Sequence, residues 1–428
     1  MERLLQYIWK YRLYTDTELC TAEGLPVSVI DPGIQNTDAG PDFFNAKIRI
    51  ADTVWAGNVE IHGKSSDWQN HRHNENPAYD SVILHVVEEY DEPACRTNGE
   101  VIPHAVIRVP PGIRQNMEWL LSRDTALPCA ERIGEIESLH VSAWMSALLT
   151  ERLERKTRDI LMLLKEYAND WNEVFYITLM RNFGFGVNSD AFEWLAKSLP
   201  LKYLLKQRCS SLQIEALLFG QAGLLLDDNP DPYYQSLQRE YVFLKEKYGL
   251  HPQDGHLIKS MRMRPVNFPH LRLAQLAAVW ANNDTLFSKM LECNDFRTLL
   301  DCFDTPLSEY WDTHYHFKFA SPAKKKTLGV NAAHIIMINT VVPILFAYGK
   351  VKSLPEYGMR ALQILENIPP ERNSLVAAFT NAGIKASNAC DTQALIQLRR
   401  EYCEKKKCLY CRIGFRIVKS GRTEPERF

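Results

Sequence analysis

Residues 40–64 read GPDFFNAKIRIADTVWAGNVEIHGK, and this stretch decides the fold of the N-terminal part of the chain. It contains two segments in which apolar and polar residues alternate, NAKIRIAD and TVWAGNVEIHG, which meet at a short turn. Such alternation is typical of half-buried β-strands, so the stretch predicts a hairpin. Glu60 and His62 stand two residues apart and therefore point to one face, while Asp42 begins the first strand. We expect Asp42 to lie near Glu60 across the hairpin.

The segments around the hairpin extend this β-rich character to about residue 125. Three more strands are predicted, in PVSVID, SVILHVVEEY and HAVIRVP, and they are divided by Gly, Pro, Asn and Asp. A helix is predicted at ERLLQYIWKYRLY, and a second one around residues 65–78. This order of elements predicts an α/β sandwich over residues 1–125.

From residue 135 the sequence reads helix after helix. Apolar residues recur at spacings of three and four with few breakers, as in VSAWMSALLTERLERKTRDILMLLKEY, and no fixed repeat period is visible. We therefore expect an all-helical domain over residues 135–428, and the fold class of the whole chain is α+β.

The composition is that of an ordinary soluble protein, with 46% hydrophobic and 24% charged residues among 428. The formal net charge of −2 gives no global basic field, so contact with nucleic acid would need a local patch. The N-terminus lacks the continuous apolar core of a signal peptide. The apolar stretch 334–349 is interrupted by Asn339, Thr340 and Pro343 and is shorter than the roughly 20 residues that span a bilayer. We expect a buried helix there, no membrane contact and a cytoplasmic location.

Two carboxylates on adjacent strands repel each other unless a positive charge lies between them. Mg²⁺ suits such a place because it takes hard oxygen ligands, and it can activate water against a phosphate. The alternative is structural: Asp42 caps a turn, and Glu60 is a solvated strand residue. Spacing alone favours the structural alternative, because such motifs often occur by chance.

The residues near the hairpin add further candidates. Asp38 and Asp67 are accessory acids, although Asp38 is also a typical turn former. His62, His71 and His73 could together hold Zn²⁺ or Mn²⁺, but their spacing matches no standard zinc pattern. In a helix, His71 and His73 would point about 200° apart, so both can face one site only if they lie in a loop.

The helix, the Pro41-Asp42 pair, the hairpin and the Glu60-Ile61-His62 triplet together resemble the PD-(D/E)XK nuclease superfamily and its αβββαβ core. This resemblance implies that Asp42 and Glu60 bind Mg²⁺, or Mn²⁺, with the carbonyl of Ile61 as a further ligand.

The superfamily's lysine position is occupied by His62 in this sequence. A histidine can orient or deprotonate water because its pKa lies near neutrality. Lys64, which follows on the same face, is the alternative source of the missing cation, and an inactive site is the third interpretation.

The whole chain also resembles a bacterial cytoplasmic family known only as a domain of unknown function. The stretches that carry this resemblance are DPGIQNTDAGPDFFNAKI, WAGNVEIHGKSSDW, NPAYDSVILHVV and YCEKKKCLYCRIG. They cover both ends of the chain, and they imply no activity.

Three of the ten cysteines, Cys403, Cys408 and Cys411, are bunched with C-x4-C-x2-C spacing. A zinc or iron–sulfur site would need a fourth ligand, which Cys390 or a histidine elsewhere could supply. The alternative is that these cysteines are small apolar residues that pack a C-terminal helix.

The C-terminal segment is strongly basic. Residues 399–422 contain nine Lys or Arg and two Glu, a net charge of +7. Such a patch suits contact with a phosphate backbone, although a solvated tail has the same composition. The candidate nucleic-acid contacts are Lys405, Lys406, Lys407, Arg412 and Arg416.

Three functions compete on these observations. The first is a metal-dependent nuclease that hydrolyses phosphodiester bonds in DNA or RNA. The second is an inactive nuclease-fold module that binds nucleic acid or a protein. The third is another metal-dependent hydrolase that uses the region of His71 and His73.

Overall fold

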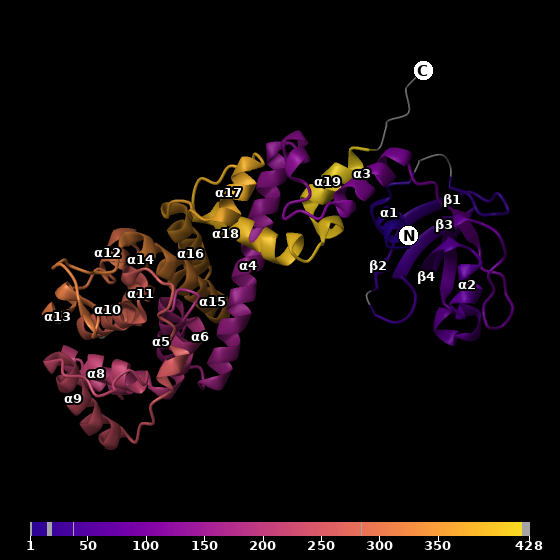
Figure 1. Cartoon of the computed structure of the whole chain (residues 1–428). Helices are drawn as coiled ribbons and strands as arrows, with labels where there is room; N and C mark the ends of the chain where they lie inside the picture. Colours follow the sequence, from indigo (N-terminus) through magenta and orange to yellow (C-terminus); the bar gives the residue numbers. More distant parts are fainter. Residues whose placement is uncertain (1, 15–18, 37, 284, 422–428) are drawn as a thin grey trace. The chain divides into compact units, whose positions relative to one another are not determined.

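The computed structural model describes residues 2–14, 19–36, 38–283 and 285–421, and the chain divides into two compact units. Unit 1 comprises Met1–Trp144, Ala378–Ile384 and Leu398–Phe428, and unit 2 comprises Met145–Ala377 and Lys385–Gln397. The fold is mixed α and β with many helices and one small mixed sheet, which confirms the predicted class (Figure 1). The predicted boundary at 125–135 falls within unit 1, and the basic C-terminal segment belongs to unit 1.

Unit 1 is built on one mixed sheet. Its strands are β1 (Val27–Asp31), β2 (Ile34–Gln35), β3 (Phe43–Ile50), β4 (Thr53–Lys64), β5 (Val82–Glu89) and β6 (His104–Val106). They lie in the order β1-β3-β4-β5-β6, with β2 paired to β3. The predicted hairpin is β3–β4, in which Ile50 pairs with Thr53, and the strands from β4 to β6 are parallel.

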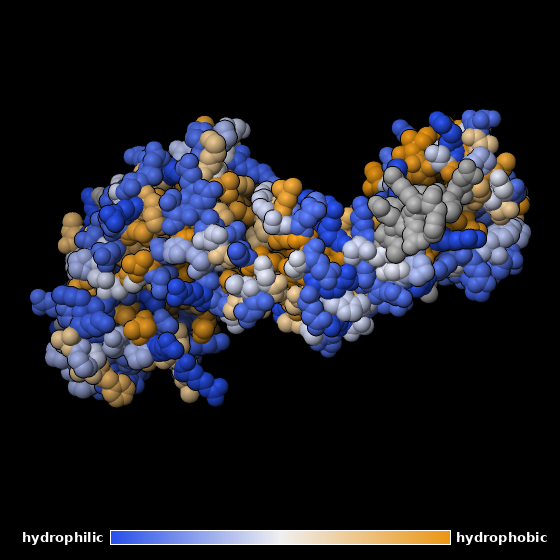
Figure 2. Space-filling model, turned by 90° about the horizontal axis from the view of Figure 1, so that it is seen from above, coloured by the Kyte–Doolittle hydropathy of each residue, from blue (hydrophilic) through white to orange (hydrophobic). Residues whose placement is uncertain are grey.

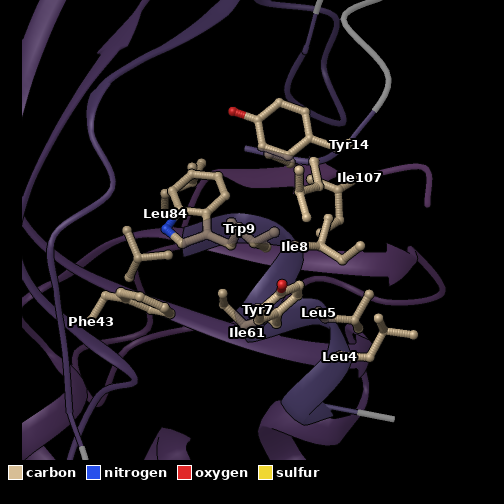
Figure 3. Close-up of a cluster of buried hydrophobic side chains, with 14 of the residues drawn as sticks. Leu4, Leu5, Tyr7, Ile8, Trp9, Tyr14, Phe43, Ile61, Leu84 and Ile107 are labelled. Atoms are coloured by element: carbon tan, nitrogen blue, oxygen red, sulfur yellow. The ribbon is translucent and has the colours of Figure 1, made fainter. Parts of the chain in front are cut away.

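Helix α1 (Glu2–Tyr11) covers one face of this sheet. Its buried side chains, among them Leu5, Ile8 and Trp9, pack against Phe43 and Ile61 of the sheet (Figure 3). The apolar residues of β3 that alternation predicts to be buried join the same core. Because Val59 and Ile61 face this core, Glu60 and His62 are turned to the opposite face.

A segment of short turns covers the opposite face. It consists of α2 (Asp67–Asn70) and two 3₁₀ turns, η1 (His73–Glu75) and η2 (Pro77–Tyr79). The prediction of one helix over 65–78 is therefore wrong, because Arg72 adopts a left-handed φ of 59° and ends the helical path. Trp68 anchors the segment in a small buried cluster whose other members are Tyr79, Val82, Ala94 and Ile102.

The rest of unit 1 brings the two ends of the chain together. After the sheet come α3 (Pro111–Ser122), η3 (Ala130–Glu135) and the first residues of the long helix α4 (Ser138–Glu166), which belongs to unit 2 from Met145 on. The C-terminal part of unit 1 holds η7 (Arg399–Cys403), η8 (Cys408–Tyr410) and α19 (Arg412–Lys419). Helix α19 lies beside α3 (Figure 1), where Asn116 donates a hydrogen bond of 2.9 Å to the carbonyl of Ile417. A Cβ at Gly112 would lie 2.2 Å from the carbonyl oxygen of Gly421, so this close approach requires glycine.

The helices after α4 follow the predicted pattern. They are α5 (Trp171–Phe183), α6 (Ser189–Ser198), α7 (Leu201–Lys206), α8 (Ser211–Gln221), α9 (Pro232–Tyr248), α10 (Pro269–Asn282), α11 (Leu286–Glu292), α12 (Phe296–Asp301), α13 (Glu309–Thr313), α14 (Val330–Ile336), α15 (Val342–Lys352), α16 (Pro355–Asn367), α17 (Ser374–Asn381) and α18 (Ala389–Leu398), with short 3₁₀ turns at Gly255–Leu257 and Pro265–Asn267. The face in Figure 2 is largely hydrophilic with scattered apolar patches, as expected if these helices bury their apolar sides.

Unit 2 departs from the prediction of an all-helical domain at one place. Strands β7 (His314–His316) and β8 (Phe319–Ala320) form a two-stranded antiparallel ribbon. The ring of Phe317, between them, packs against Trp311 and Phe219. The reversal between β7 and β8 thus places the ring of Phe317 in the core of unit 2, where it is buried.

The apolar stretch around 334–349 belongs to a longer continuous helix. Val330–Lys352 has 23 residues, comprising α14, a π-helical turn (Met337–Val341) and α15. By length and composition alone this helix could cross a membrane. The expectation that the apolar stretch is too short to span a bilayer is therefore wrong. In the most apolar stretch of 18 residues within this helix, 61% is buried inside the protein, as is usual for a core helix.

A buried carboxyl group in unit 2, that of Glu215, has a strongly shifted pKa. Glu215 on α8 is 2% exposed and accepts hydrogen bonds of 2.9 Å from Tyr233 and from the indole of Trp311. Burial raises the pKa of Glu215 to about 7, although these hydrogen bonds favour the charged form.

We expect Glu215→Gln to stabilise the protein at pH 8 but not at pH 4. The folded state favours the protonated carboxyl group, so its stabilisation is complete below the unfolded pKa of 4.5 and is lost as pH rises through about 7. The gain at pH 8 should be of the order of 3 kcal/mol. Calorimetric unfolding at both pH values tests this, with Glu246→Gln on the exposed side of α9 as the matched control. A gain of equal size at pH 4 and pH 8 would contradict the assignment.

Candidate metal centre

Asp42 and Glu60 meet across the hairpin of β3 and β4. The backbone N–H of Asp42 donates to Oε2 of Glu60 at 2.9 Å, and the N–H of Ile61 donates to Oδ2 of Asp42 at 3.1 Å. Gln6 of α1 donates to Oδ1 of Asp42 at 2.7 Å. The hairpin register and α1 therefore fix both carboxyl groups, and Glu60 is 5% exposed.

Three histidines lie together here, and two of them contact the carboxyl group of Glu60. Oε1 of Glu60 lies 3.6 Å from Nε2 of His62 and 3.3 Å from Nε2 of His73. Nδ1 of His71 lies 3.1 Å from Nε2 of His62. The three histidine ligand atoms all lie within 4.8 Å of one another. The left-handed turn at Arg72 makes this possible, because it removes the opposed orientation that a helix would impose.

These distances fit the coordination shell of a small divalent ion. Ligands about 2.1 Å from a tetrahedral ion lie about 3.4 Å apart, and octahedral neighbours lie about 3.0 Å apart. The separations of 3.1 and 3.3 Å fall between these two values, and the separation of 3.6 Å lies slightly above both. Three imidazole nitrogens close to one another, with a carboxylate oxygen beside two of them, suit a transition metal better than Mg²⁺.

The electrostatics of the cluster also favour a bound cation. Burial is the main cause that raises the pKa of Glu60 and of Asp42, each to about 7, and the charge of Glu60 raises the pKa of Asp42 further. Burial and the neighbouring histidines lower the pKa of His62 to about 3, so its imidazole is neutral and its contact with Glu60 is not an ion pair. Burial also lowers the pKa of His73. Neutral imidazoles are the protonation state that metal binding needs, and a bound cation would offset the cost of ionising the two buried carboxyl groups.

A second layer of side chains orients these ligands. Nδ1 of His62 shares a hydrogen bond of 2.8 Å with Nε2 of His85, which β5 places beside Glu60 and which is fully buried. Ligand histidines commonly use their second ring nitrogen for such a hydrogen bond. The ring of His73 stacks on the ring of Tyr79, with 3.8 Å between the ring centroids. Gln6 and Tyr79 were missed in the sequence because nothing in their local pattern marks them.

Of the other sequence candidates near the hairpin, Asp67 lies close enough to His62 and His71 to interact with them electrostatically, and Lys64 and Asp38 have other partners. Lys64 pairs with Glu89 on β5 at 3.0 Å and is half exposed. Asp67 accepts a hydrogen bond of 3.0 Å from the backbone of Lys64, which lowers its pKa. Asp38 is exposed, and its backbone N–H bonds to Asn36. The side chain of Ile61 is buried in the core on the α1 side.

Most of the basic candidates near the C-terminus have partners within unit 1. Lys405 pairs with Glu401, and Lys406 pairs with Asp124. The guanidinium of Arg412 lies 5.0 Å from the ring of Trp144, and Arg416 bonds to His140. Lys407 is exposed, and Arg422 lies outside the described residues.

Comparison with known proteins places the chain in one family. A family model described as "Protein of unknown function (DUF2851)" matches residues 2–374. The chain belongs to this family. No curated protein and no solved structure matches it. The part that matches the DUF2851 model includes Asp42, Glu60 and the three histidines, and it ends before the basic C-terminal segment.

Proposed function

We propose that unit 1 is a metal-dependent nuclease that hydrolyses phosphodiester bonds in DNA or RNA. The observation that carries this proposal is the convergence of His62, His71 and His73, whose ligand atoms lie within 4.8 Å of one another, with Glu60 in contact with His62 and His73 and with Asp42 held beside Glu60. A divalent ion bound there would supply a Lewis acid for the phosphate and a hydroxide from bound water.

The arrangement of elements supports a PD-(D/E)XK-like core for this unit. Helix α1 precedes the β3–β4 hairpin, α2 connects β4 to the parallel strand β5, and β6 follows. Asp42 stands at the start of β3 and Glu60 lies within β4, as the superfamily resemblance implies. Fold likeness alone does not define an activity, so the proposal rests on the side chains of the site.

The residues of the site take different roles in this proposal. Glu60, His62 and His73 are buried and hold their positions through strand β4 and the Trp68 cluster. His71 is exposed, so the substrate phosphate would approach from its side. Asp42 is a positioning residue, because its own N–H fixes Oε2 of Glu60. His85 holds the ring of His62 through Nδ1 and leaves Nε2 facing the centre.

Removal and replacement of metal tests the proposal. The full chain, stripped with a chelator, should not cleave single- or double-stranded DNA or RNA, and Zn²⁺ or Mn²⁺ should restore cleavage better than Mg²⁺ because the donor set is rich in imidazole. Cleavage products and bound metal should be measured on the same samples. Tight metal binding without cleavage of any substrate would favour the inactive binding module. If none of the three ions binds, both the metal centre and the nuclease assignment fail.

A further inference from the structure

A small cavity in unit 1, away from the hairpin, is lined by four cysteines. Its volume is about 20 Å³, and its walls contain Cys129, Cys403, Cys408 and Cys411 together with apolar residues such as Leu120 and Ile413. The ten cysteines of the chain all lie among the described residues, and they are in the thiol form. Four of the six cysteines in unit 1 therefore gather around one small space.

Local geometry brings the C-terminal three together. Lys406 adopts a left-handed φ of 50°, which reverses the chain between Cys403 and Cys408. The N–H of Cys411 donates to the carbonyl of Cys408 at 3.2 Å, and Cys411 then begins α19. A Cβ at Gly414 would lie 2.1 Å from that same carbonyl oxygen, so glycine is required for this close packing.

Cys129 comes from a distant part of the sequence. It precedes η3, in the connection that follows α3, and the packing of α19 on α3 carries it to the other three. Each of the four thiols interacts electrostatically with the other three. Cys390, the fourth ligand considered from the sequence, lies in α18 of unit 2, where its thiol contacts the carbonyl of Leu362.

We propose that Cys129, Cys403, Cys408 and Cys411 hold an iron–sulfur cluster. The C-x4-C-x2-C spacing with a fourth cysteine far away in the sequence is one of the established patterns of cluster ligation. Structural zinc sites more often combine two separate pairs of close ligands, whereas here three close cysteines form one run and Cys129 stands alone. Binding converts four thiols to thiolates and releases their protons to solvent.

The cluster would fasten the C-terminal segment to the N-terminal part of unit 1. Its ligands lie on either side of the contact between α3 and α19, where Arg132 and Asn116 already reach Ser420 and Ile417. Its role would therefore be to stabilise this junction, and it is independent of the metal centre at Glu60.

Anaerobic purification of the full chain tests the proposal. We expect iron and inorganic sulfide in equal amounts, with the broad visible absorption of a cluster. Cys129→Ser should lower the iron content about tenfold or more, whereas Cys390→Ser, the matched control, should leave it unchanged. Loss of iron in Cys390→Ser with retention in Cys129→Ser would overturn the ligand assignment.

The wild-type protein gives an answer even if Cys129→Ser does not fold. Zinc at one ion per chain that is lost in Cys411→Ser would replace the iron–sulfur assignment with a zinc site. Anaerobically purified protein without iron or sulfide would also overturn it. Activity at the Glu60 centre is a separate readout, so failure of one proposal leaves the other distinguishable.

Discussion

Glu60→Gln should reduce metal-dependent cleavage by more than about a hundredfold, because loss of an outer-shell partner alone costs 10- to 100-fold and Glu60 is proposed to be a direct ligand. Oε1 of Glu60 lies closest to both His62 and His73, so the substitution removes the negative charge from the centre of the donor set. Metal affinity measured by calorimetry and cleavage rates measured with saturating metal would separate lost binding from lost chemistry.

The amide variant is chosen so that the fold survives. The side-chain oxygen of Gln can still accept the N–H of Asp42, and a neutral group at this buried position avoids a desolvated charge. Glu89→Gln is the matched control, because Glu89 is an exposed carboxylate on the neighbouring strand β5. Equal cleavage by Glu60→Gln and wild type would remove Glu60 from the proposed centre.

Trp68→Ala should destabilise the site face of unit 1 by about 3–5 kcal/mol, the usual cost of deleting a buried tryptophan. Trp68 is fully buried, donates to the carbonyl of Cys95 at 2.9 Å, and contacts the rings of His73 and His85. Trp68 belongs to the same segment as His71 and His73, so the cavity left by its removal should loosen these turns.

Hydrogen exchange measures this loss locally. Backbone amides of residues 67–79, the segment that Trp68 anchors, should lose protection by about a hundredfold or more in Trp68→Ala, the equivalent of about 3 kcal/mol. Trp55→Ala is the control, because Trp55 lies on the same strand as Glu60 but is 49% exposed. Unchanged protection in both variants would mean that Trp68 does not hold the segment in place.

The hairpin shows how far a local pattern determines structure. Alternation along β3 and β4 correctly predicts that Ala46, Ile48 and Ile50 are buried and that Glu60 faces away from Ile61. It also predicts that Asp42 approaches Glu60, since register follows from a short turn. These features depend on residues close in sequence, so one strand and its neighbour suffice to predict them.

The segment after the hairpin shows where the local pattern fails. A helix was predicted over 65–78, and in a helix His71 and His73 would point apart. The left-handed residue Arg72 carries no strong sequence signal, since glycine or asparagine is the usual residue there. The burial of Trp68 beneath the turns overrides the local helical preference.

The sequence by itself therefore determined the sheet, the shared face of Glu60 and His62, and the spacing of Cys403, Cys408 and Cys411. Only the tertiary structure decided that His71 and His73 join that face and that Cys129 completes the cysteine cluster. The physical reason is the range of the interactions. Strand alternation and cysteine spacing are set within a few residues, whereas the two clusters form when distant segments bury their apolar sides against one another.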